Sequence, residues 1–323
     1  MKLKIIIYGL GNIYEKYREY LYRRFDVVGV TSSNDEEGMK HANYISCKEI
    51  GSIDYDYVLI CSRSQNAILN KLIDDLKIPR EKIAINNVEF DSNGIFHSQV
   101  NEDAICLLLL SRLIKNFRDL TYIDIGANHP VCLNNTYLFY TLGAKGVLVE
   151  PDINLKNLIE TVRPRDTLIC KAIGVDSGKK KFFKLKNSML NTMYYDKLDM
   201  EFCKNYQAFE IEDECEVETI TINQLFSELA VMPDLMSIDI EGCNYEVLEQ
   251  MNFCEFRPKV IIAELSAWGE KEQKGEKIIK LLIKNNYAQI STNGNINGIF
   301  IDKKFENDLQ DFLIKDFTFN FEI

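Results

Sequence analysis

The chain has 323 residues, of which 46% are hydrophobic and 27% charged, and its net charge is −11. A length beyond ~250–300 residues favours two domains, and this composition excludes a disordered chain. Residues 96–323 carry −10 of the −11 charge, which disfavours a polymeric nucleic acid as substrate because such a partner requires a basic face.

The apolar segments are too short to cross a membrane. The longest apolar run, residues 104–110, ends at Ser111, well short of the ~20 residues that a span requires. The apolar run at the N-terminus is also too short for a signal peptide with its cleavage site. The nine cysteines are scattered and form no C-x-x-C pair, which argues against a disulfide framework or a cysteine zinc site. We therefore expect a cytoplasmic protein with reduced thiols.

Residues 1–95 alternate short strands and helices, which predicts a small α/β domain. The expected elements are Lys4–Tyr8, Tyr14–Arg24, Val27–Val30, Tyr57–Cys61, Ala67–Leu76 and Ile83–Ile85. Alternation of this kind predicts a parallel sheet with crossover helices, as in Rossmann-like folds. Turn-forming residues at 91–94 mark the expected boundary.

The first turn of this small domain, Gly9-Leu10-Gly11, begins like a dinucleotide-binding fingerprint. However, Tyr14 stands where the third glycine would be, and the second strand ends in Thr31 and two serines instead of an acid. An NAD-dependent oxidoreductase is therefore disfavoured. Two interpretations stay open: the turn binds a nucleotide or sugar-nucleotide phosphate at the helix N-terminus, or the domain is structural and supports a homo-oligomer.

A packing helix is expected within residues 96–118, and a longer α/β domain in residues 119–323. Apolar residues at helical spacing between Glu102 and Phe117 predict the helix, which would bridge the two domains. The expected strands of the second domain are Tyr122–Ile125, Gly146–Val149, Leu168–Ile173, Val217–Ile222, Leu235–Ile240, Val260–Glu264, Ala288–Ser291 and Gly298–Ile301. An Asn-Gly turn separates the last two strands. The prediction is a mostly parallel sheet that finishes with an antiparallel hairpin.

The ends of these strands carry the residues that predict chemistry. A tight turn at Gly126 follows one strand, Glu150 ends the next, Asp239 and Glu241 follow a later one, and Glu264 ends another. Open α/β sheets bind ligands at the carboxyl ends of their strands, where an acid can accept both hydroxyl protons of a ribose. Each residue alone is compatible with an ordinary turn or a solvent-facing acid. Repetition at successive strand ends favours a nucleoside-binding edge, because buried strands otherwise exclude charge.

Taken together, several stretches resemble the FkbM-type methyltransferases. They are Ile123–Asn128, Val149–Asp152, Ala172–Gly174, Ser237–Gly242 with Val247-Leu248, and Arg257–Glu264, in the family's order over about residues 120–302. The resemblance implies a Rossmann-like methyltransferase fold, bound S-adenosylmethionine and methyl transfer to oxygen, often on a sugar or a natural product. The loop at His129-Pro130 departs from the commonest family pattern and looks like the variant Gly-Ala-Asn-His-Pro followed by Asn-Thr, here Asn135-Thr136.

The same resemblance assigns residues to the cofactor. It implies that Asp124, Gly126, Asn128 and Glu150 contact S-adenosylmethionine and that Asp239 lies near the transferred methyl group. The matched stretches add Ala127, Thr136, Pro151, Asp152 and Ala172 to the expected cofactor site.

An acceptor hydroxyl must lose its proton during methyl transfer, and three residues are candidates to receive it: His129, Asp239 and Glu264. His129 is either this base or a residue that orients the cofactor loop through hydrogen bonds. Asp239, Glu241 and Glu264 could instead hold Mg²⁺, which prefers oxygen ligands. The spacing does not demand a metal, and a base or substrate anchor explains these acids with fewer assumptions.

Residues 178–216 are predicted to be an insertion near the cofactor edge, either a substrate lid or surface decoration.

The predicted function is an S-adenosylmethionine-dependent O-methyltransferase acting on a hydroxyl of a saccharide or nucleotide-activated sugar. Two alternatives stay open: a methyltransferase acting on a small natural product, and a noncatalytic nucleotide- or sugar-nucleotide-binding module.

Overall fold

The computed structural model describes residues 2–62, 64–85, 97–229, 231–270, 273–293 and 296–305. The chain divides into two compact units, residues 1–92 with 154–164, and residues 93–153 with 165–323. The boundary expected at residues 91–94 and part of the expected turn, Gly294, lie outside the described residues.

The first unit contains a four-stranded parallel sheet with the strand order β2-β1-β3-β4. Its elements are β1 (Lys4–Tyr8), α1 (Asn12–Arg24), β2 (Asp26–Thr31), α2 (Asp35–Gly38), β3 (Tyr57–Ile60), α3 (Gln65–Asn70) and β4 (Ile83–Ile85). The buried face of α1, with Tyr14 and Leu21, packs against Ile5 and Ile7 of β1. The predicted parallel α/β organisation is confirmed.

The second unit is built on a seven-stranded sheet with the order β13-β14-β12-β11-β5-β6-β7. Its strands are β5 (Thr121–Ile125), β6 (Lys145–Val149), β7 (Thr167–Ile169), β11 (Leu235–Ile238), β12 (Val260–Glu264), β13 (Tyr287–Asn293) and β14 (Asn297–Asp302). In this sheet β14 is antiparallel to both β12 and β13, and the other described pairs of neighbouring strands are parallel. The mostly parallel sheet with its C-terminal antiparallel hairpin is therefore confirmed.

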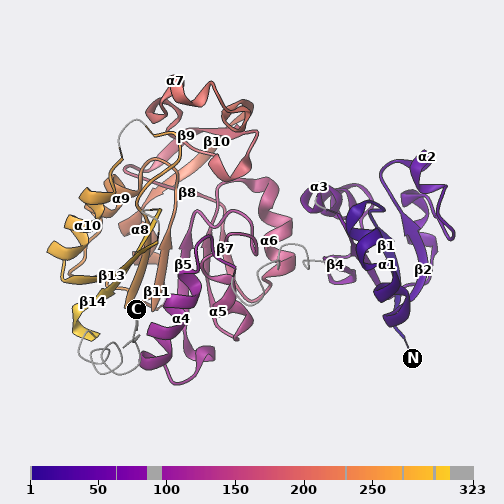
Figure 1. The fold of residues 1–323 in the computed structure, drawn as a ribbon, viewed down its shortest axis with the longest axis horizontal. Coiled ribbons are helices and arrows are strands. Elements are labelled where there is room, and N and C mark those ends of the chain that lie inside the picture. The colour runs from indigo at the N-terminus through magenta and orange to yellow at the C-terminus, as the bar shows by residue number, and fades with distance from the viewer. Residues whose placement is uncertain are drawn as a thin grey trace, which may run out of the picture. The chain divides into compact units, whose positions relative to one another are not determined.

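Helices cover the two faces of this sheet (Figure 1). They are α4 (Glu102–Leu113), α5 (Tyr137–Thr141), α8 (Ile222–Glu228), α9 (Asn244–Gln250) and α10 (Gly275–Lys284); a further helix, α6 (Lys156–Val162), belongs to the first unit. Helices α8, α9 and α10 pack in sequence against one another, and α4 packs against α5. Central strands such as β11 and β12 are buried along their whole length and mostly apolar, as is typical of strands covered on both faces.

One predicted strand is wrong in its extent, and this changes the topology near the site. The expected strand Leu168–Ile173 is two elements: β7 ends at Ile169 in the main sheet, and β8 (Ala172–Gly174) starts a second sheet of order β8-β10-β9. The chain leaves the main sheet here because Ala172 pairs with Thr219 of β10 (Ile211–Thr221). The strand expected at Val217–Ile222 is thus longer and belongs to this second sheet.

The rest of the predicted insertion is also ordered. It contains β9 (Gly178–Leu185) and the short helix α7 (Met200–Cys203), and β9 pairs antiparallel with β10. Charged residues are frequent along both strands and pair across them, as Lys179 does with Glu216 and Lys181 with Glu214. Because of this charged pattern, the sequence does not predict β9 and predicts only the end of β10. We call residues 186–209 the capping segment.

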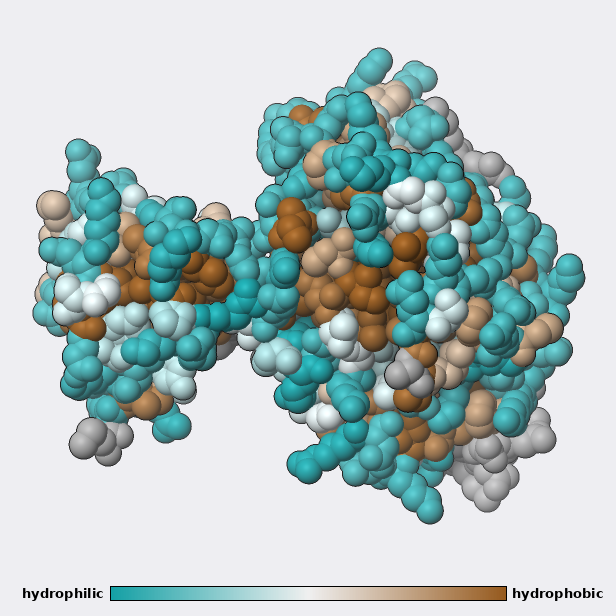
Figure 2. Space-filling model, turned by 180° about the vertical axis from the view of Figure 1, so that it is seen from behind, coloured by the Kyte–Doolittle hydropathy of each residue, from teal (hydrophilic) through white to brown (hydrophobic). Residues whose placement is uncertain are grey.

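The face of the larger unit that Figure 2 shows is mostly hydrophilic, with an apolar area near its centre. Among the described helices, none combines the length and apolar character that a bilayer span requires.

Candidate cofactor and substrate site

A cavity of about 490 Å³ lies at the carboxyl edge of the seven-stranded sheet. Its lining includes Gly126–Asn128 in the turn after β5, Val149–Pro151 at the end of β6 and Asp239–Glu241 after β11. Glu264 at the end of β12 and Met189–Met193 of the capping segment line it as well. Most of these segments were selected from the sequence as strand ends. The volume is in the range of small-molecule and cofactor sites.

The turn after β5 can be made only by glycine. Gly126 has a φ of +83°, and a Cβ atom there would lie 1.7 Å from the carbonyl oxygen of Asp239. The backbone N–H of Gly126 donates to the carbonyl of Val149 at 2.9 Å. The ends of β5, β6 and β11 are thus held close together, and the backbone is open to a ligand.

Glu150 supplies a buried carboxylate to the same cavity. Its side chain is 5% exposed and accepts hydrogen bonds from the backbone N–H groups of Asn128 at 2.9 Å and Asp152 at 2.8 Å. Burial outweighs these two bonds and raises the pKa of Glu150 to about 7. A carboxylate held in this way offers its remaining acceptor sites to paired hydroxyl groups.

Asp124 and Thr136 lie at the two ends of the loop between β5 and α5, which we call the cofactor loop, and the cavity lining does not include them. Thr136 donates to Asp124 at 2.7 Å, and Asn134 donates to the same carboxylate oxygen at 3.1 Å. Asp152 is likewise outside the lining, because it forms an ion pair with Lys184 at 2.8 Å. Of the expected cofactor residues, the lining includes Gly126, Ala127, Asn128, Glu150, Pro151 and Ala172.

His129 serves the loop rather than the cavity. Its Nδ1 accepts hydrogen bonds from the backbone N–H groups of Val131 at 3.2 Å and Cys132 at 2.9 Å. Burial lowers the pKa of His129 to about 4, so the ring is neutral near pH 7. His129 is not part of the cavity lining. This geometry matches the loop-orienting alternative.

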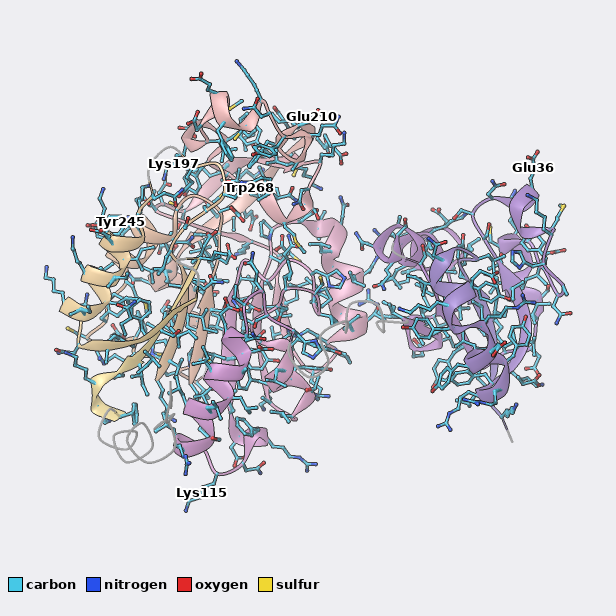
Figure 3. All side chains as sticks on the ribbon, viewed as in Figure 1. Glu36, Lys115, Lys197, Glu210, Tyr245 and Trp268 are labelled. Carbon is cyan, nitrogen blue, oxygen red and sulfur yellow. The ribbon has the colours of Figure 1, made fainter. Side chains whose placement is uncertain are left out.

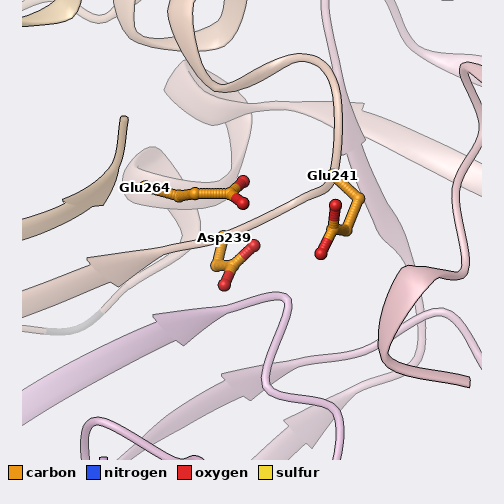
Figure 4. A group of neighbouring side chains, drawn as sticks. All are labelled: Asp239, Glu241 and Glu264. Carbon is orange, nitrogen blue, oxygen red and sulfur yellow. The ribbon is translucent and has the colours of Figure 1, made fainter. Parts of the chain in front are cut away.

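Three carboxylates meet at one end of the cavity (Figure 4). Oxygen atoms of Asp239, Glu241 and Glu264 lie within 4.8 Å of one another. Oδ1 of Asp239 is buried and has no hydrogen-bond partner among the described residues, whereas Glu264 accepts from Asn244 at 2.7 Å.

Burial and mutual repulsion shape the ionisation of this group. Burial raises the pKa of Asp239 to about 6, and burial together with the charge of Asp239 raises the pKa of Glu264 well above its usual value. The two neighbouring carboxyl groups therefore do not ionise independently, and the pair favours retention of a proton. The group can share protons internally, or its oxygen atoms can surround a cation such as Mg²⁺.

Some residues of the cavity lining are not predicted from the sequence. Gln99, Lys171, Phe182 and Trp268 also face the cavity. Lys171 directly precedes β8, and Phe182 belongs to β9, a strand that was not predicted. Trp268 follows β12 by four residues and is the only tryptophan of the chain, a signal that could have drawn attention to it.

The sheet order and the cavity at its carboxyl edge define a Rossmann-like methyltransferase fold. The methyltransferase FkbM domain matches residues 124–289, and a C2185-like N-terminal domain matches residues 1–84. The chain belongs to the FkbM methyltransferase family and is an S-adenosylmethionine-dependent methyltransferase. A search of curated proteins finds no significant match.

Similar solved structures are distant. The precorrin-6y C5,15-methyltransferase from Geobacter metallireducens is 14% identical, with a TM-score of 0.33 over 61% of this chain and 87% of that one. The magnesium protoporphyrin IX methyltransferase from Synechocystis, solved with bound S-adenosylmethionine, is 9% identical, with a TM-score of 0.32 over 74% and 97%. The O-methyltransferase from Bacillus cereus, in complex with S-adenosylhomocysteine, is 12% identical, with a TM-score of 0.33 over 72% and 96%.

The residues of the cavity fit S-adenosylmethionine. Glu150 is a buried acceptor suited to the ribose hydroxyls, and the turn at Gly126 leaves backbone accessible beside it. Ile173 and Phe182 add apolar surface suited to an adenine ring.

Proposed function

We propose that the enzyme transfers a methyl group to a hydroxyl of a saccharide or nucleotide-activated sugar. The observation that carries this proposal is the unpartnered Oδ1 of Asp239, which belongs to a group of three carboxylates in the cavity. Carboxylate oxygens accept hydrogen bonds and bear no donors when ionised. A substrate with several neighbouring hydroxyl groups satisfies such a group, whereas an acceptor without donors leaves it unpaired.

In this proposal Glu150 and the turn at Gly126 position the cofactor, which supplies an electrophilic methyl group on a sulfonium centre. Asp239 accepts the proton of the acceptor hydroxyl as the new oxygen–carbon bond forms and the bond between the methyl carbon and sulfur breaks, which leaves S-adenosylhomocysteine. With a pKa of about 6, Asp239 is ionised at neutral pH and its basicity is close to the operating pH, as general-base catalysis requires. Glu264, whose pKa is higher, retains a proton and anchors a neighbouring hydroxyl.

Residues outside the lining support these groups. Asp124, Thr136 and His129 hold the cofactor loop through hydrogen bonds to side chains and backbone beneath it. The Asp152–Lys184 ion pair joins the end of β6 to β9. We assign them positioning roles, because their polar atoms are used within the protein. We also propose a cytoplasmic location, since the nine cysteines, all of which lie in the described part of the chain, form no disulfide.

A direct experiment combines the purified full chain and S-adenosylmethionine with a panel of methyl glycosides and nucleotide sugars, and analyses products by mass spectrometry and NMR. We expect a methyl ether at one sugar hydroxyl, and a rate of product formation at least about a hundredfold lower with Asp239→Asn at matched enzyme concentration. Methylation of nitrogen or carbon in a nonsugar acceptor, with no sugar product, would contradict the proposal and favour the natural-product alternative.

A further inference from the structure

Trp268 has an unusual position for the single tryptophan of the chain. Its side chain is 44% exposed, although it lines the same cavity as Asp239 and Glu264. Figure 3 shows Trp268 in the larger unit beside the segment that carries α7. A large apolar side chain left this exposed at a cavity is a candidate contact for a ligand.

The orientation of the indole ring is set by three aromatic rings of the capping segment. The ring centroid of Trp268 lies 6.2 Å from Phe202, 5.1 Å from Tyr206 and 4.8 Å from Phe209. The corresponding interplanar angles are 82°, 61° and 50°. None of these three rings lies parallel to the indole, so none forms a parallel stack with it.

The backbone beside Trp268 is fixed as well. Gly269 has a φ of +86°, and a Cβ atom there would lie 2.7 Å from the ring of Phe209. The carbonyl of Gly269 accepts a hydrogen bond from the N–H of Asp199 at 2.7 Å. The indole is therefore presented by a preorganised loop, which lowers the entropic cost of using it to bind a ligand.

The chemistry around Trp268 limits what can lie against it. Polar side chains of Asn191 and Ser266 share the cavity with the indole, and the three carboxylates meet at one end of it. A pyranose ring has an apolar face of C–H groups that packs on an indole and a periphery of hydroxyls that these side chains can bind. A uronic acid would add a second negative charge to the cavity that holds the ionised Asp239, which is unfavourable.

We propose that Trp268 is the specificity-determining platform for the acceptor: an uncharged hexopyranose ring stacks on its indole and directs a hydroxyl towards Asp239. This inference rests on the proposed sugar O-methyltransferase function and makes it more specific. It commits to a neutral ring, whereas the proposed function also allows charged sugars.

The single tryptophan makes a direct binding test available. Indole emission, excited selectively at the red edge of its absorption, reports Trp268 alone among the aromatic residues. The full-length protein saturated with S-adenosylhomocysteine is titrated with methyl hexopyranosides and, separately, with the methyl glycoside of glucuronic acid. We expect a saturable emission change with at least one neutral glycoside and none with the glucuronide. No change with any neutral glycoside, or an equal change with the glucuronide, would overturn the inference.

Kinetics supply a second, independent measurement. Trp268→Ala should raise the KM for the acceptor about tenfold or more, and Trp268→Phe should raise it less, because a smaller aromatic face remains. The affinity for S-adenosylhomocysteine should stay unchanged in both variants. Tyr20→Ala, which removes an exposed aromatic residue in the first unit, is the matched control and should behave as wild type.

The two proposals can fail separately. Normal sugar methylation with an unchanged acceptor KM in both Trp268 variants would reject the platform and leave the proposed function intact. Failure to methylate any sugar would reject the proposed function, and the emission titration would still decide whether a neutral ring docks on Trp268. Thermal unfolding of each variant identifies a general folding defect, in which case the milder Trp268→Phe decides the kinetic test.

Discussion

The carboxylate of Glu150 accepts a hydrogen bond from the backbone N–H of Asn128 at 2.9 Å. This bond joins the end of β6 to the turn that follows β5. The acid and the turn therefore face the same cavity, as a site for an adenosyl group requires.

Gly126→Ala should destabilise the protein by at least about 3 kcal/mol, because the new methyl group collides with the carbonyl of Asp239 and φ is positive. Denaturant unfolding measures this change, and any folded fraction should bind S-adenosylhomocysteine poorly. Gly51→Ala is the control, since a Cβ atom there has no neighbour within 4 Å. A Gly126→Ala protein as stable as this control would refute the described turn.

His129 should make stability depend on pH. Its folded pKa is about 4, below the ordinary value of 6.5, so the unfolded chain binds the proton more readily. The contribution is fully present above about pH 6.5 and falls by up to about 3 kcal/mol as the pH drops towards about 4. Unfolding measured across this range should lose that component in His129→Asn, whose amide oxygen can still accept the loop N–H groups. An identical pH dependence in both proteins would contradict the buried, neutral histidine.

Asp239→Asn should lower kcat about 10²–10⁴-fold, because the amide cannot accept the hydroxyl proton. The affinity for S-adenosylhomocysteine should change little, since Glu150 and the turn at Gly126 remain. Asp213→Asn, at an exposed site on β10, is the control and should retain full activity. If Asp239→Asn turns over normally, another group accepts the proton.

Removal of divalent cations should leave methyl transfer unchanged. Burial and the charge of Asp239 raise the pKa of Glu264, so the acid group can retain a proton in place of a metal. Activity is measured before and after exhaustive chelation, with Mg²⁺ added back. Loss of activity that Mg²⁺ restores would show that Asp239, Glu241 and Glu264 hold a cation instead.

The sequence predicts the seven-stranded sheet and most of its ligand-binding edge for a physical reason. Buried parallel strands are long apolar runs, so a glycine or an acid at their ends, such as Gly126, Glu150 or Asp239, is conspicuous. The topology then brings these ends to one edge without further information. Residues such as Asp124 and Asp152 lie in the same stretches, but their contacts with Thr136 and Lys184 depend on side-chain directions that a linear pattern does not contain.

For the side of the cavity lined by the capping segment, the sequence predicts an insertion near the cofactor edge but not its internal structure. Strand β9 has three consecutive lysines and lacks the apolar alternation that identifies a strand, and of β10 only the end, from Val217, was predicted. The break between Ile169 and Ala172 depends on pairing with Thr219, which is distant in the chain. Trp268 reaches the cavity only because the capping segment folds against it, and such long-range packing leaves no local pattern.

Calorimetric titration with S-adenosylhomocysteine tests the central claim most directly. The wild-type chain should bind it in a one-to-one complex, and Glu150→Ala should weaken binding at least about tenfold, because the buried acceptor for the ribose hydroxyls is lost. Glu150→Gln should fall between them, since it keeps the shape and one acceptor oxygen. Absence of binding to the wild-type chain, or equal affinities in all three proteins, would contradict the assignment of this cavity to the cofactor.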